Sequence, residues 1–414
     1  MNFLKNQELC LRTGEWLLPR GGESRWACVA CDQFTSQPEY WAKARAFVGE
    51  SPSTLKLILP ESELAEAPQR VPEIQKEMER YLAEGILTPA EGFILTERTT
   101  ESGTRYGLVV LMDLEGYDYR PGSHSLIRPT EGTIVDRIPP RLMVRRGAAL
   151  ELSHVMMLID DPKDTVLAPL KDKKEKLKKL YDFPLMMEGG QLTGYLVETV
   201  KDTEAIAGAL AQLKEKLQGD APLLYAVGDG NHSLATAKAN WEEKKETLTP
   251  EESREHPARF AMVELLNIHD SALRFEPIHR VLFHVKPMEV LADLDNYAKG
   301  QGISLAGEEI CWVSGEKQGE FALKNASQTL PVGALQVFLD QWMQEHPEAM
   351  LDYIHGEDTV RVLAKEGNAL GFLLPTPDKG SLFTAVAKEG VLPRKTFSMG
   401  EANEKRYYME ARKI

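Results

Sequence analysis

The sequence predicts a mixed α/β chain of the α+β kind, in which short strands and amphipathic helices alternate. Two observations support this class. Apolar or alternating runs of strand length flank turn-like residues 98–104, and a second pair, 183–187 and 195–200, flanks Gly189 and Gly190, as in β-hairpins. Stretches with helical periodicity, such as residues 203–217, lie between further apolar strands. These patterns do not give the strand order.

The remaining elements follow from periodicity and from residues that begin or end helices. Residues 72–84 should form a helix because Pro72 suits a first helical position and Gly85 suits the end. Pro68 argues against an earlier start. The lysine-rich run 171–180 reads as the solvated side of a helix, and the chain ends in a polar tail. Other helices are expected at 39–48, 203–217, 234–246 and 334–344, and strands at 155–159 and 223–227. Residues 259–266 are mostly apolar, and residues 275–283 carry the sequence Pro277-Ile-His-Arg280.

Length and charge limit the possible classes of protein. The chain has 414 residues, enough for two or three domains, and its 43% hydrophobic and 27% charged content is that of a soluble protein. We expect a core at 1–284 that carries the motifs below and a smaller mixed α/β region at 285–414. The net charge of −14 makes nucleic acid an unlikely partner, since binding it needs a basic face.

The lack of a recognisable targeting signal and the cysteine usage predict a cytoplasmic location. The first twelve residues contain the charged Lys5, Glu8 and Arg12, so they lack the apolar core of a signal peptide. No apolar run reaches the roughly 18–20 residues of a membrane span. Four cysteines in a chain this long do not form a disulfide framework. Cys28 and Cys31 are half of a zinc site without a second pair, so their spacing is read as incidental.

The loop Gly228-Asp-Gly-Asn-His-Ser233 joins a predicted strand to a predicted helix. Gly228 and Gly230 permit a close backbone approach, and a helix start offers free amides to an anion, with Asn231 and Ser233 beside them. Asp229 is a candidate proton acceptor or metal ligand, and His232 a candidate phosphate contact. An ordinary capped turn explains every residue except His232 about equally well.

Two further segments carry candidate site residues. Arg128 and Arg137 are suited to bidentate binding of phosphate or carboxylate, and Glu131 between them is a candidate base. His279 and Arg280 lead into the apolar run Val281-Leu-Phe283, which reads as a strand, so they could project into a polar site. Each segment by itself is explained better by a structural role, surface ion pairs for the first and a histidine at the edge of the core for the second.

Taken together and in order, these segments resemble an uncharacterised bacterial and archaeal family, the domain-of-unknown-function 1015 family, often labelled ParB-like. The matching motifs are Asp229-Gly-Asn-His-Ser-Leu-Ala-Thr-Ala237, Arg128-Pro-Thr-Glu-Gly-Thr133 with Asp136-Arg137, Pro277-Ile-His-Arg280 and Pro393-Arg-Lys-Thr396. The resemblance implies a ParB/sulfiredoxin-like core with an additional α+β C-terminal region. Its superfamily includes a free serine kinase with an Asp-Gly-His-His-Arg loop.

This chain departs from the family pattern at the loop and before Glu131. Asn231 stands where the family has His, Ser233 where it has Arg, and Thr130 where it has His. The missing loop arginine leaves Arg128, Arg137 or Arg280 to neutralise a phosphate. Sulfiredoxin-like chemistry is disfavoured because the loop has no cysteine nucleophile.

The resemblance and the motifs favour an enzyme that transfers a phosphoryl group from ATP or ADP, with Mg²⁺, to a small hydroxyl substrate such as an amino acid. Asp229, Glu131 and His232 would be catalytic, with Asp229 also holding the metal, and the loop residues, the arginines and His279 would bind the nucleotide. A ParB-like nucleotide-dependent binding or regulatory module without turnover is the alternative. A metal-dependent hydrolase that uses Asp229, His232 and His279 is a weaker one.

Overall fold

A computed structural model describes residues 5–21, 23–217, 219, 221–365 and 367–414. It confirms a mixed α/β chain and divides it into two compact units. Unit 1 comprises residues 1–129, 133–273 and 400–414, and unit 2 comprises residues 130–132 and 274–399. The sequence predicted a division after residue 284. In the structure it falls after residue 273, and the segment 400–414 returns to unit 1.

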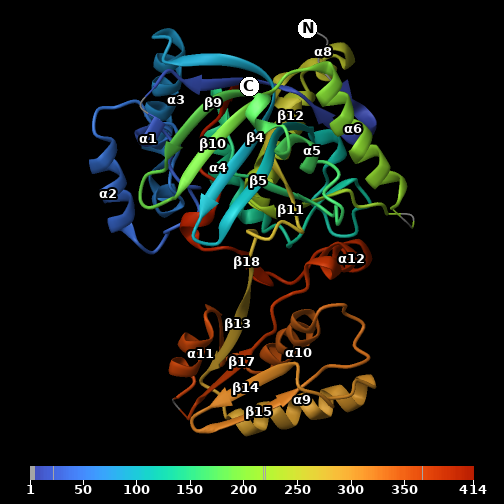
Figure 1. Cartoon of the computed structure of the whole chain (residues 1–414). Coiled ribbons are helices and arrows are strands. Elements are labelled where there is room, and N and C mark those ends of the chain that lie inside the picture. The colour runs from blue at the N-terminus through green and yellow to red at the C-terminus, as the bar shows by residue number, and fades with distance from the viewer. Residues whose placement is uncertain (1–4, 22, 218, 220, 366) are drawn as a thin grey trace. The chain divides into compact units, whose positions relative to one another are not determined.

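The described part of unit 1 contains one 13-stranded sheet, whose main path runs β6-β11-β8-β12-β5-β4-β3-β19-β7. Strand β11 is parallel to β6, and β12 is parallel to β8, whereas the central pairs β12–β5 and β5–β4 are antiparallel. Figure 1 labels β4, β5, β10, β11 and β12 of this sheet. The strands are β1 Lys5–Asn6, β2 Leu11–Arg12, β3 Gly14–Pro19, β4 Leu87–Thr100, β5 Gly103–Asp113, β6 Ile127–Pro129, β7 Leu150–Leu152, β8 Met156–Ile159, β9 Lys178–Pro184, β10 Gln191–Val197, β11 Tyr225–Asp229, β12 Phe260–Asn267 and β19 Ala411–Lys413.

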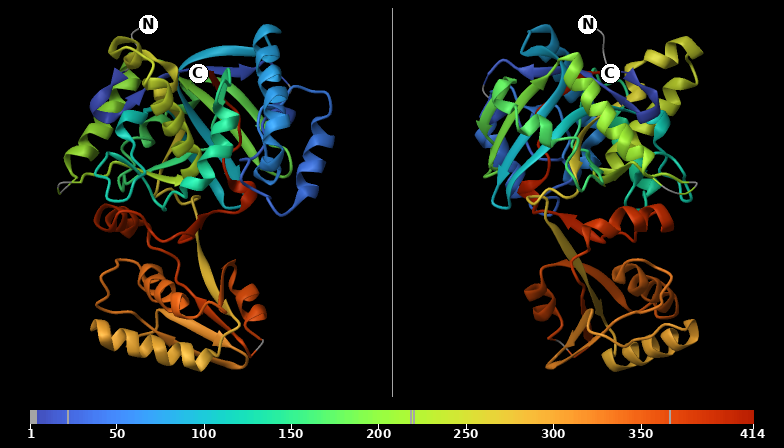
Figure 2. Two further views of the ribbon diagram at one scale, coloured as in Figure 1. Left: turned by 180° about the vertical axis from the view of Figure 1, so that it is seen from behind. Right: turned by 45° about the vertical axis from the view of Figure 1, so that its right-hand side comes forward.

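Both faces of this sheet are covered, which explains why its central strands are apolar runs (Figure 2). In β5, Leu108 and Val110 belong to one core cluster with helices α6 and α7, and Val109 belongs to the opposite cluster with α2 and α3. The helices of unit 1 are α1 Glu23–Trp26, α2 Pro38–Val48, α3 Ala67–Ala83, α4 Ile138–Arg145, α5 Ala168–Lys171, α6 Val200–Glu215, α7 Asn231–Lys245 and α8 Pro250–Glu255.

The two predicted hairpins are confirmed. Strands β4 and β5 pair antiparallel from Thr100 opposite Gly103, and β9 and β10 pair across the turn that contains Gly189 and Gly190. Gly190 has a φ of 84°, and a Cβ there would lie 2.1 Å from the carbonyl oxygen of Thr99. Only glycine fits this turn.

Three expectations were wrong. Helix α3 begins at Ala67, because Pro68 occupies its first turn, where a missing amide costs nothing, and Pro72 lies inside the helix. The run 171–180 is the end of α5, a 3-10 turn and the start of β9, so its lysines do not mark a helix face. The C-terminal residues, read as a polar tail, are mostly buried and contribute β19.

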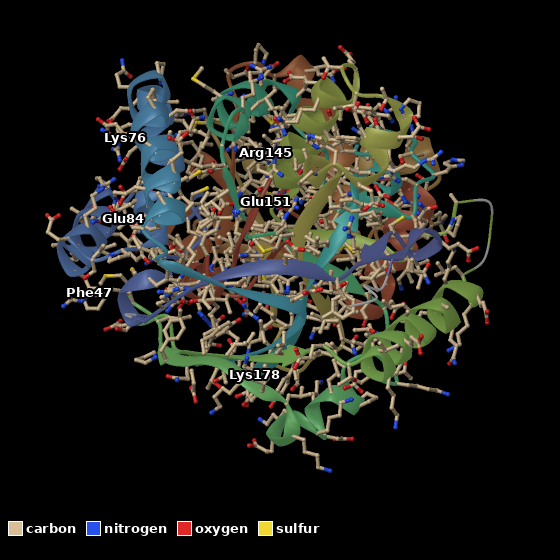
Figure 3. The ribbon with its side chains drawn as sticks, turned by 90° about the horizontal axis from the view of Figure 1, so that it is seen from above. Phe47, Lys76, Glu84, Arg145, Glu151 and Lys178 are labelled. Atoms are coloured by element: carbon tan, nitrogen blue, oxygen red, sulfur yellow. The ribbon has the colours of Figure 1, made fainter. Side chains whose placement is uncertain are left out.

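Buried ion pairs hold this C-terminal segment in unit 1. Glu151 is 3% exposed and accepts hydrogen bonds from Arg412 and, at 2.5 Å, from Nη2 of Arg145. Figure 3 labels Arg145 and Glu151 inside unit 1, whereas exposed side chains such as Lys76 and Lys178 lie at its rim. Because the desolvated carboxylate is paired on both sides, the segment is fixed in place.

Unit 2 is a smaller α/β unit whose described residues form a six-stranded sheet with the main order β15-β14-β17-β13-β16. The long strand β13 pairs with β16, β17 and β18, all antiparallel. Its strands are β13 Phe275–Phe283, β14 Ile310–Ser314, β15 Lys317–Phe321, β16 Met350–His355, β17 Ala369–Leu373 and β18 Phe397–Met399. Its helices are α9 Pro287–Gln301, α10 Pro331–Glu345, α11 Glu357–Leu363 and α12 Lys379–Glu389.

A search of the helices in the described ranges found none that combines the length and the apolar character needed to cross a membrane.

Candidate functional site

The loop at residues 228–233 is a tight strand-to-helix junction in unit 1. Strand β11 ends at Asp229, and α7 begins at Asn231, earlier than the expected residue 234. Between them Gly230 has a φ of 79°, and a Cβ on it would lie 3.0 Å from Cα of Val155 on the neighbouring chain segment. Glycine at this position therefore satisfies both the left-handed backbone and the close approach.

The start of α7 leaves several polar groups available. Leu234 is the first residue whose amide bonds back to the turn, at 3.0 Å from the carbonyl oxygen of Gly230. The amides of Asn231, His232 and Ser233 consequently have no acceptor within the helix. The side-chain oxygen of Asn231 is buried and accepts no hydrogen bond among the described residues. Free amides and the positive end of the helix dipole favour an anion here.

The two carboxylate oxygens of Asp229 differ in their hydrogen bonding. Its Oδ1 accepts a hydrogen bond from the amide of Gly230 at 2.9 Å. Its Oδ2 is buried, accepts no hydrogen bond from the described residues, and lies 3.6 Å from Nζ of Lys405. Lys405 is 7% exposed, so both charges are largely removed from water.

His232 is held neutral. Burial, together with the charges of Arg141 and Arg137, lowers its pKa to about 4. Its Nε2 accepts a hydrogen bond from the amide of Ile134 at 3.2 Å, which requires Nε2 to be unprotonated. The proton of the neutral ring therefore lies on Nδ1, and His232 offers a ligand one N–H donor without a positive charge.

Three residues around this loop were not predicted from the sequence. Asp32 lies 3.6 Å from Nε2 of His154, whose Nδ1 is 2.7 Å from the hydroxyl of Tyr408. Burial alone would raise the pKa of Asp32, but His154, a hydrogen bond from Gln33 and the charge of Lys405 together lower it. Asp32 also acts electrostatically on His232. Lys405 is thus electrostatically coupled to two carboxylates, Asp32 and Asp229.

The signals that would have found these residues were weak. Asp32 directly follows Cys31 of the Cys-x-x-Cys pair, and no recognisable motif includes the acid. Lys405 lies in the segment read as a polar tail. Both cysteines are free, and burial raises the pKa of Cys28 to about 12 and that of Cys31 above its ordinary value. The thiols are therefore poor nucleophiles.

The two predicted arginines of unit 1 differ in their surroundings. Arg128 is 3% exposed and donates to the carbonyl oxygens of Ser123 at 3.1 Å and Ala221 at 2.9 Å. That is a structural use of its guanidinium. Its buried Nε has no hydrogen-bond partner within the part of the chain that the structure describes. Arg137 is exposed and close enough to His232 to lower the pKa of that ring.

Glu131, His279 and Arg280 belong to unit 2. There the backbone amide of Lys395 donates to Oε1 of Glu131 at 3.1 Å, and Arg280 donates to the carbonyl oxygen of Lys395 at 3.0 Å. Three motifs that are far apart in the sequence thus meet at residues 393–396. Arg280 is fully buried, and burial lowers its pKa to about 10. Nδ1 of His279 accepts the amide of Leu374 at 3.0 Å.

No group of three or more His, Cys, Asp and Glu side chains that could hold a metal ion was found in the described ranges. A lone carboxylate such as Asp229 can still take part in Mg²⁺ binding, because that ion commonly uses one or two carboxylates together with substrate phosphates.

Comparison with known proteins gives one strong match and several weak ones. Residues 16–380 match the family described as "Protein of unknown function (DUF1015)". No curated protein matches the sequence. A free serine kinase in complex with AMP has 14% identity and a TM-score of 0.38, with 73% of this chain and 90% of that chain covered. A conserved hypothetical protein from Pyrococcus furiosus has 13% identity and a TM-score of 0.35, with 74% and 94% covered. These structural likenesses are too weak to assign a ligand or a reaction to this chain.

Proposed function

The chain belongs to the DUF1015 family of proteins of unknown function, and we propose that its unit 1 binds a nucleotide by its phosphates and transfers a phosphoryl group to a small hydroxyl substrate. An amino acid such as serine is a suitable acceptor. The observation that carries this proposal is the position of Lys405. Its ammonium lies 3.6 Å from Asp229 and interacts with Asp32, beside the free amides at the start of α7.

The phosphate would lie at the start of α7. The amides of Asn231, His232 and Ser233 would donate to its oxygens, and Nδ1–H of the neutral His232 would add a further donor. Lys405 and the exposed Arg137 would neutralise its charge in place of the loop arginine that this chain lacks. Phosphoryl transfer depends mainly on such positioning and charge stabilisation.

The acceptor hydroxyl would be oriented by Asp32. A lowered pKa keeps this carboxylate ionised at neutral pH, so that it can accept a hydrogen bond or a proton from the substrate. His154, itself held by the hydroxyl of Tyr408, fixes the carboxylate in place. Asp32 thereby takes the role of base that was expected of Glu131.

Magnesium fits the same site through Asp229. Its Oδ2 is a buried oxygen with no hydrogen bond from the described residues, which suits a hard cation shared with phosphate oxygens. When bound, the ion would supply charge neutralisation on the transferred group. Lys405, which forms an ion pair with the same oxygen, would share that task.

The proposal does not require the unit 2 residues. Glu131, His279 and Arg280 each have partners inside unit 2, and Arg128 donates to backbone carbonyls of unit 1. A ParB-like module that binds nucleotide without turnover remains the second candidate. It is favoured by Ser233, because a polar but uncharged residue replaces the loop arginine of the family pattern.

One assay separates the candidates. The purified protein is incubated with Mg²⁺, serine and either ATP or ADP, and ³¹P NMR follows the formation of a phosphate monoester over hours. We expect product with the wild type and at least a hundredfold less with Asp32→Asn. The control Asp172→Asn changes an exposed carboxylate in the same unit and should leave the rate unchanged.

Nucleotide binding with no new phosphorus signal for any hydroxyl acceptor tested would support the binding module and reject phosphoryl transfer. Absence of both binding and transfer would reject the two nucleotide functions together.

A further inference from the structure

The chain segment that leads into Lys405 is held by two buried arginines of the unit 1 sheet. Arg98 on β4 donates from Nη2 to the carbonyl oxygen of Asn403 at 2.9 Å. Arg105 on β5 donates from Nη1 to the carbonyl oxygen of Glu404 at 2.7 Å. The two arginines therefore fix the peptide groups of the two residues that precede Lys405.

The placement of these arginines is unfavourable by itself. Arg98 and Arg105 are directly opposite each other in the antiparallel register and are only 2% and 5% exposed. Like charges in such positions repel, and burial strengthens the repulsion because water no longer screens it. Burial, and next to it the charge of Arg105, lowers the pKa of Arg98 to about 9. Buried charges add little net stability, so a role in fixing one conformation is the better reason for the pair.

The chain is also held on the other side of Lys405. Nη2 of Arg406 pairs with Glu410 at 2.8 Å, and Nε of Arg406 lies 3.4 Å from Oε2 of Glu264. Nη1 of Arg406 donates to the carbonyl oxygen of Ser153 at 3.0 Å. Lys405 thus lies between two segments whose positions are set by buried guanidinium groups.

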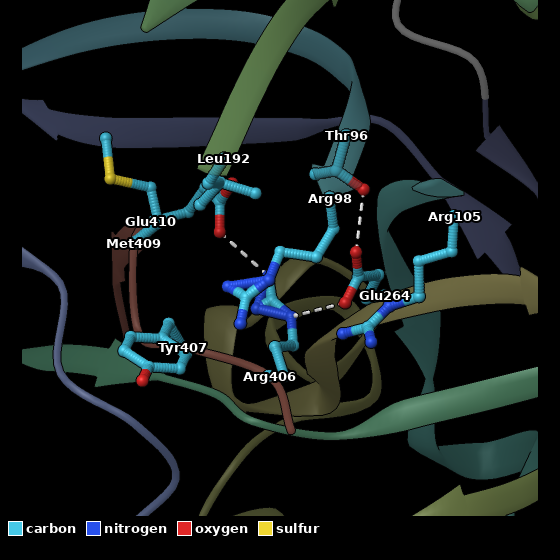
Figure 4. A pocket seen from close by; sticks show the side chains of 9 residues that line it. All are labelled: Thr96, Arg98, Arg105, Leu192, Glu264, Arg406, Tyr407, Met409 and Glu410. Carbon is cyan, nitrogen blue, oxygen red and sulfur yellow. Dashed lines mark hydrogen bonds and ion pairs between the residues drawn. The ribbon is translucent and has the colours of Figure 1, made fainter. Parts of the chain in front are cut away.

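A small pocket lies between these arginines. Figure 4 shows the arginine side chains of β4, β5 and the C-terminal segment gathered around it, with the ion pairs of Arg406 dashed. The ring of Tyr407 lies 4.7 Å from the guanidinium carbon of Arg98 and closes one side. The pocket has room for about one water, so the arginines act through their contacts with the protein chain and not through a bound ligand.

We propose that Arg98 and Arg105 are positioning residues of the α7 site, which hold the preceding peptide groups and thereby fix the ammonium of Lys405 against Asp229. Lysine is a point charge on a flexible stem, so its position depends on how firmly its backbone is held. The arginines act through Lys405, since their donors are directed at backbone carbonyl groups. The inference rests on the proposed function, in which Lys405 neutralises the phosphate.

The direct test follows the position of Lys405 without any ligand. Lysines of the folded chain are reductively methylated for short times, and peptide mapping gives the rate at each one. Lys405 is 7% exposed and paired with Asp229, so it should react slowly in the wild type. Arg105→Met keeps a side chain of similar length and removes the donor. It should raise the rate at Lys405 about tenfold or more, as expected when a hydrogen bond from a charged donor is lost, and leave the exposed Lys178 unchanged.

Matched variants separate positioning from packing. Arg105→Lys keeps the charge and a donor, so it should restore the slow rate at Lys405 at least in part. Arg259→Met removes another largely buried arginine, paired with Asp113 at 2.6 Å, and should leave that rate unchanged. An unchanged rate in Arg105→Met, equal rates in Arg105→Met and Arg105→Lys, or the same rise in Arg259→Met would overturn the proposal. Arg98→Met is judged in the same way if Arg105→Met does not fold.

Nucleotide binding connects the arginines to the proposed function. Calorimetric titration with ADP and Mg²⁺ compares the wild type, Arg105→Met, Lys405→Gln and the double variant. We expect Arg105→Met to weaken binding in the wild type and to have no further effect in Lys405→Gln, because the arginine acts through the lysine. Additive losses would contradict the positioning role. If the wild type binds no nucleotide, the proposed function fails, and the methylation rates still decide whether the arginines position Lys405.

Discussion

The ammonium of Lys405 lies 3.6 Å from Oδ2 of Asp229, although the two residues are 176 positions apart in the sequence. The contact joins the C-terminal segment to the loop that begins α7. It places a positive charge where the chain lacks the arginine of the family motif.

Lys405→Gln should weaken nucleotide binding at least tenfold, which corresponds to about 1.4 kcal/mol. The substitution removes the charge that would neutralise the phosphate and keeps a hydrogen-bonding side chain of similar length. Calorimetric titration with ADP and ATP in the presence of Mg²⁺ measures the change. Lys178→Gln, an exposed lysine of β9, serves as the control and should bind like the wild type. Equal affinities for the two variants would remove Lys405 from the site.

Gly230→Ala should destabilise unit 1 by about 1–3 kcal/mol, because alanine must adopt a φ of 79° and its Cβ meets Val155 at 3.0 Å. Urea unfolding measures the loss. Gly208→Ala is the matched control. Gly208 lies inside α6, and a Cβ there would meet no atom within 4 Å, so alanine should stabilise the chain by about 0.5–1 kcal/mol. If Gly230→Ala left the free energy of unfolding unchanged, the loop would have relaxed without strain, contrary to this prediction.

His232 should make the protein less stable as the pH falls from about 6.5 to about 4. Its folded pKa is lowered to about 4, so in this window the unfolded chain binds a proton that the folded chain does not, and unfolding becomes easier. Urea midpoints of the wild type and His232→Gln are compared at each pH. The wild type should lose stability relative to the variant, and parallel curves would mean that the ring titrates normally.

Cys311 should react first with a thiol reagent in the folded protein. Burial raises the pKa of all four thiols, to about 11 for Cys10 and about 12 for Cys28, and these two side chains are buried, whereas Cys31 and Cys311 are partly exposed. Of the two partly exposed thiols, Cys31 lies near the carboxylates of Asp32 and Glu61, which raise its pKa further, whereas the charge of Arg361 acts to lower the pKa of Cys311. Peptide mapping after brief alkylation at pH 8 identifies the modified residues, and the denatured chain is the control. Rapid labelling of Cys28 under native conditions would show that the segment before Asp32 opens readily.

Local patterns were enough to predict the hairpins β4–β5 and β9–β10, since a turn glycine and flanking apolar strands fix such pairs over short distances. The predictions for the start of α3 and for the lysine-rich run were wrong because these local signals are ambiguous. A proline is harmless in a first helical turn, and charge composition does not distinguish a helix from an exposed strand.

The loop at 228–233 could be identified from its own residues, but its surroundings could not. Asp32, His154 and Lys405 reach it from segments that are distant in sequence and carry no motif. The opposite positions of Arg98 and Arg105 depend on the hairpin register, which spacing alone does not give. Conversely, Arg128 and Arg280 match motifs, yet the fold uses them to hold backbone carbonyls.

The most direct measurement of the central claim is a calorimetric titration of the wild type and Asp229→Asn with ADP and ATP, each with and without Mg²⁺. We predict saturable binding of a nucleotide by the wild type that is strengthened by Mg²⁺, and loss of that Mg²⁺ dependence in Asp229→Asn. No heat of binding with either nucleotide, or an identical response of the two proteins, would contradict a phosphate site at the start of α7.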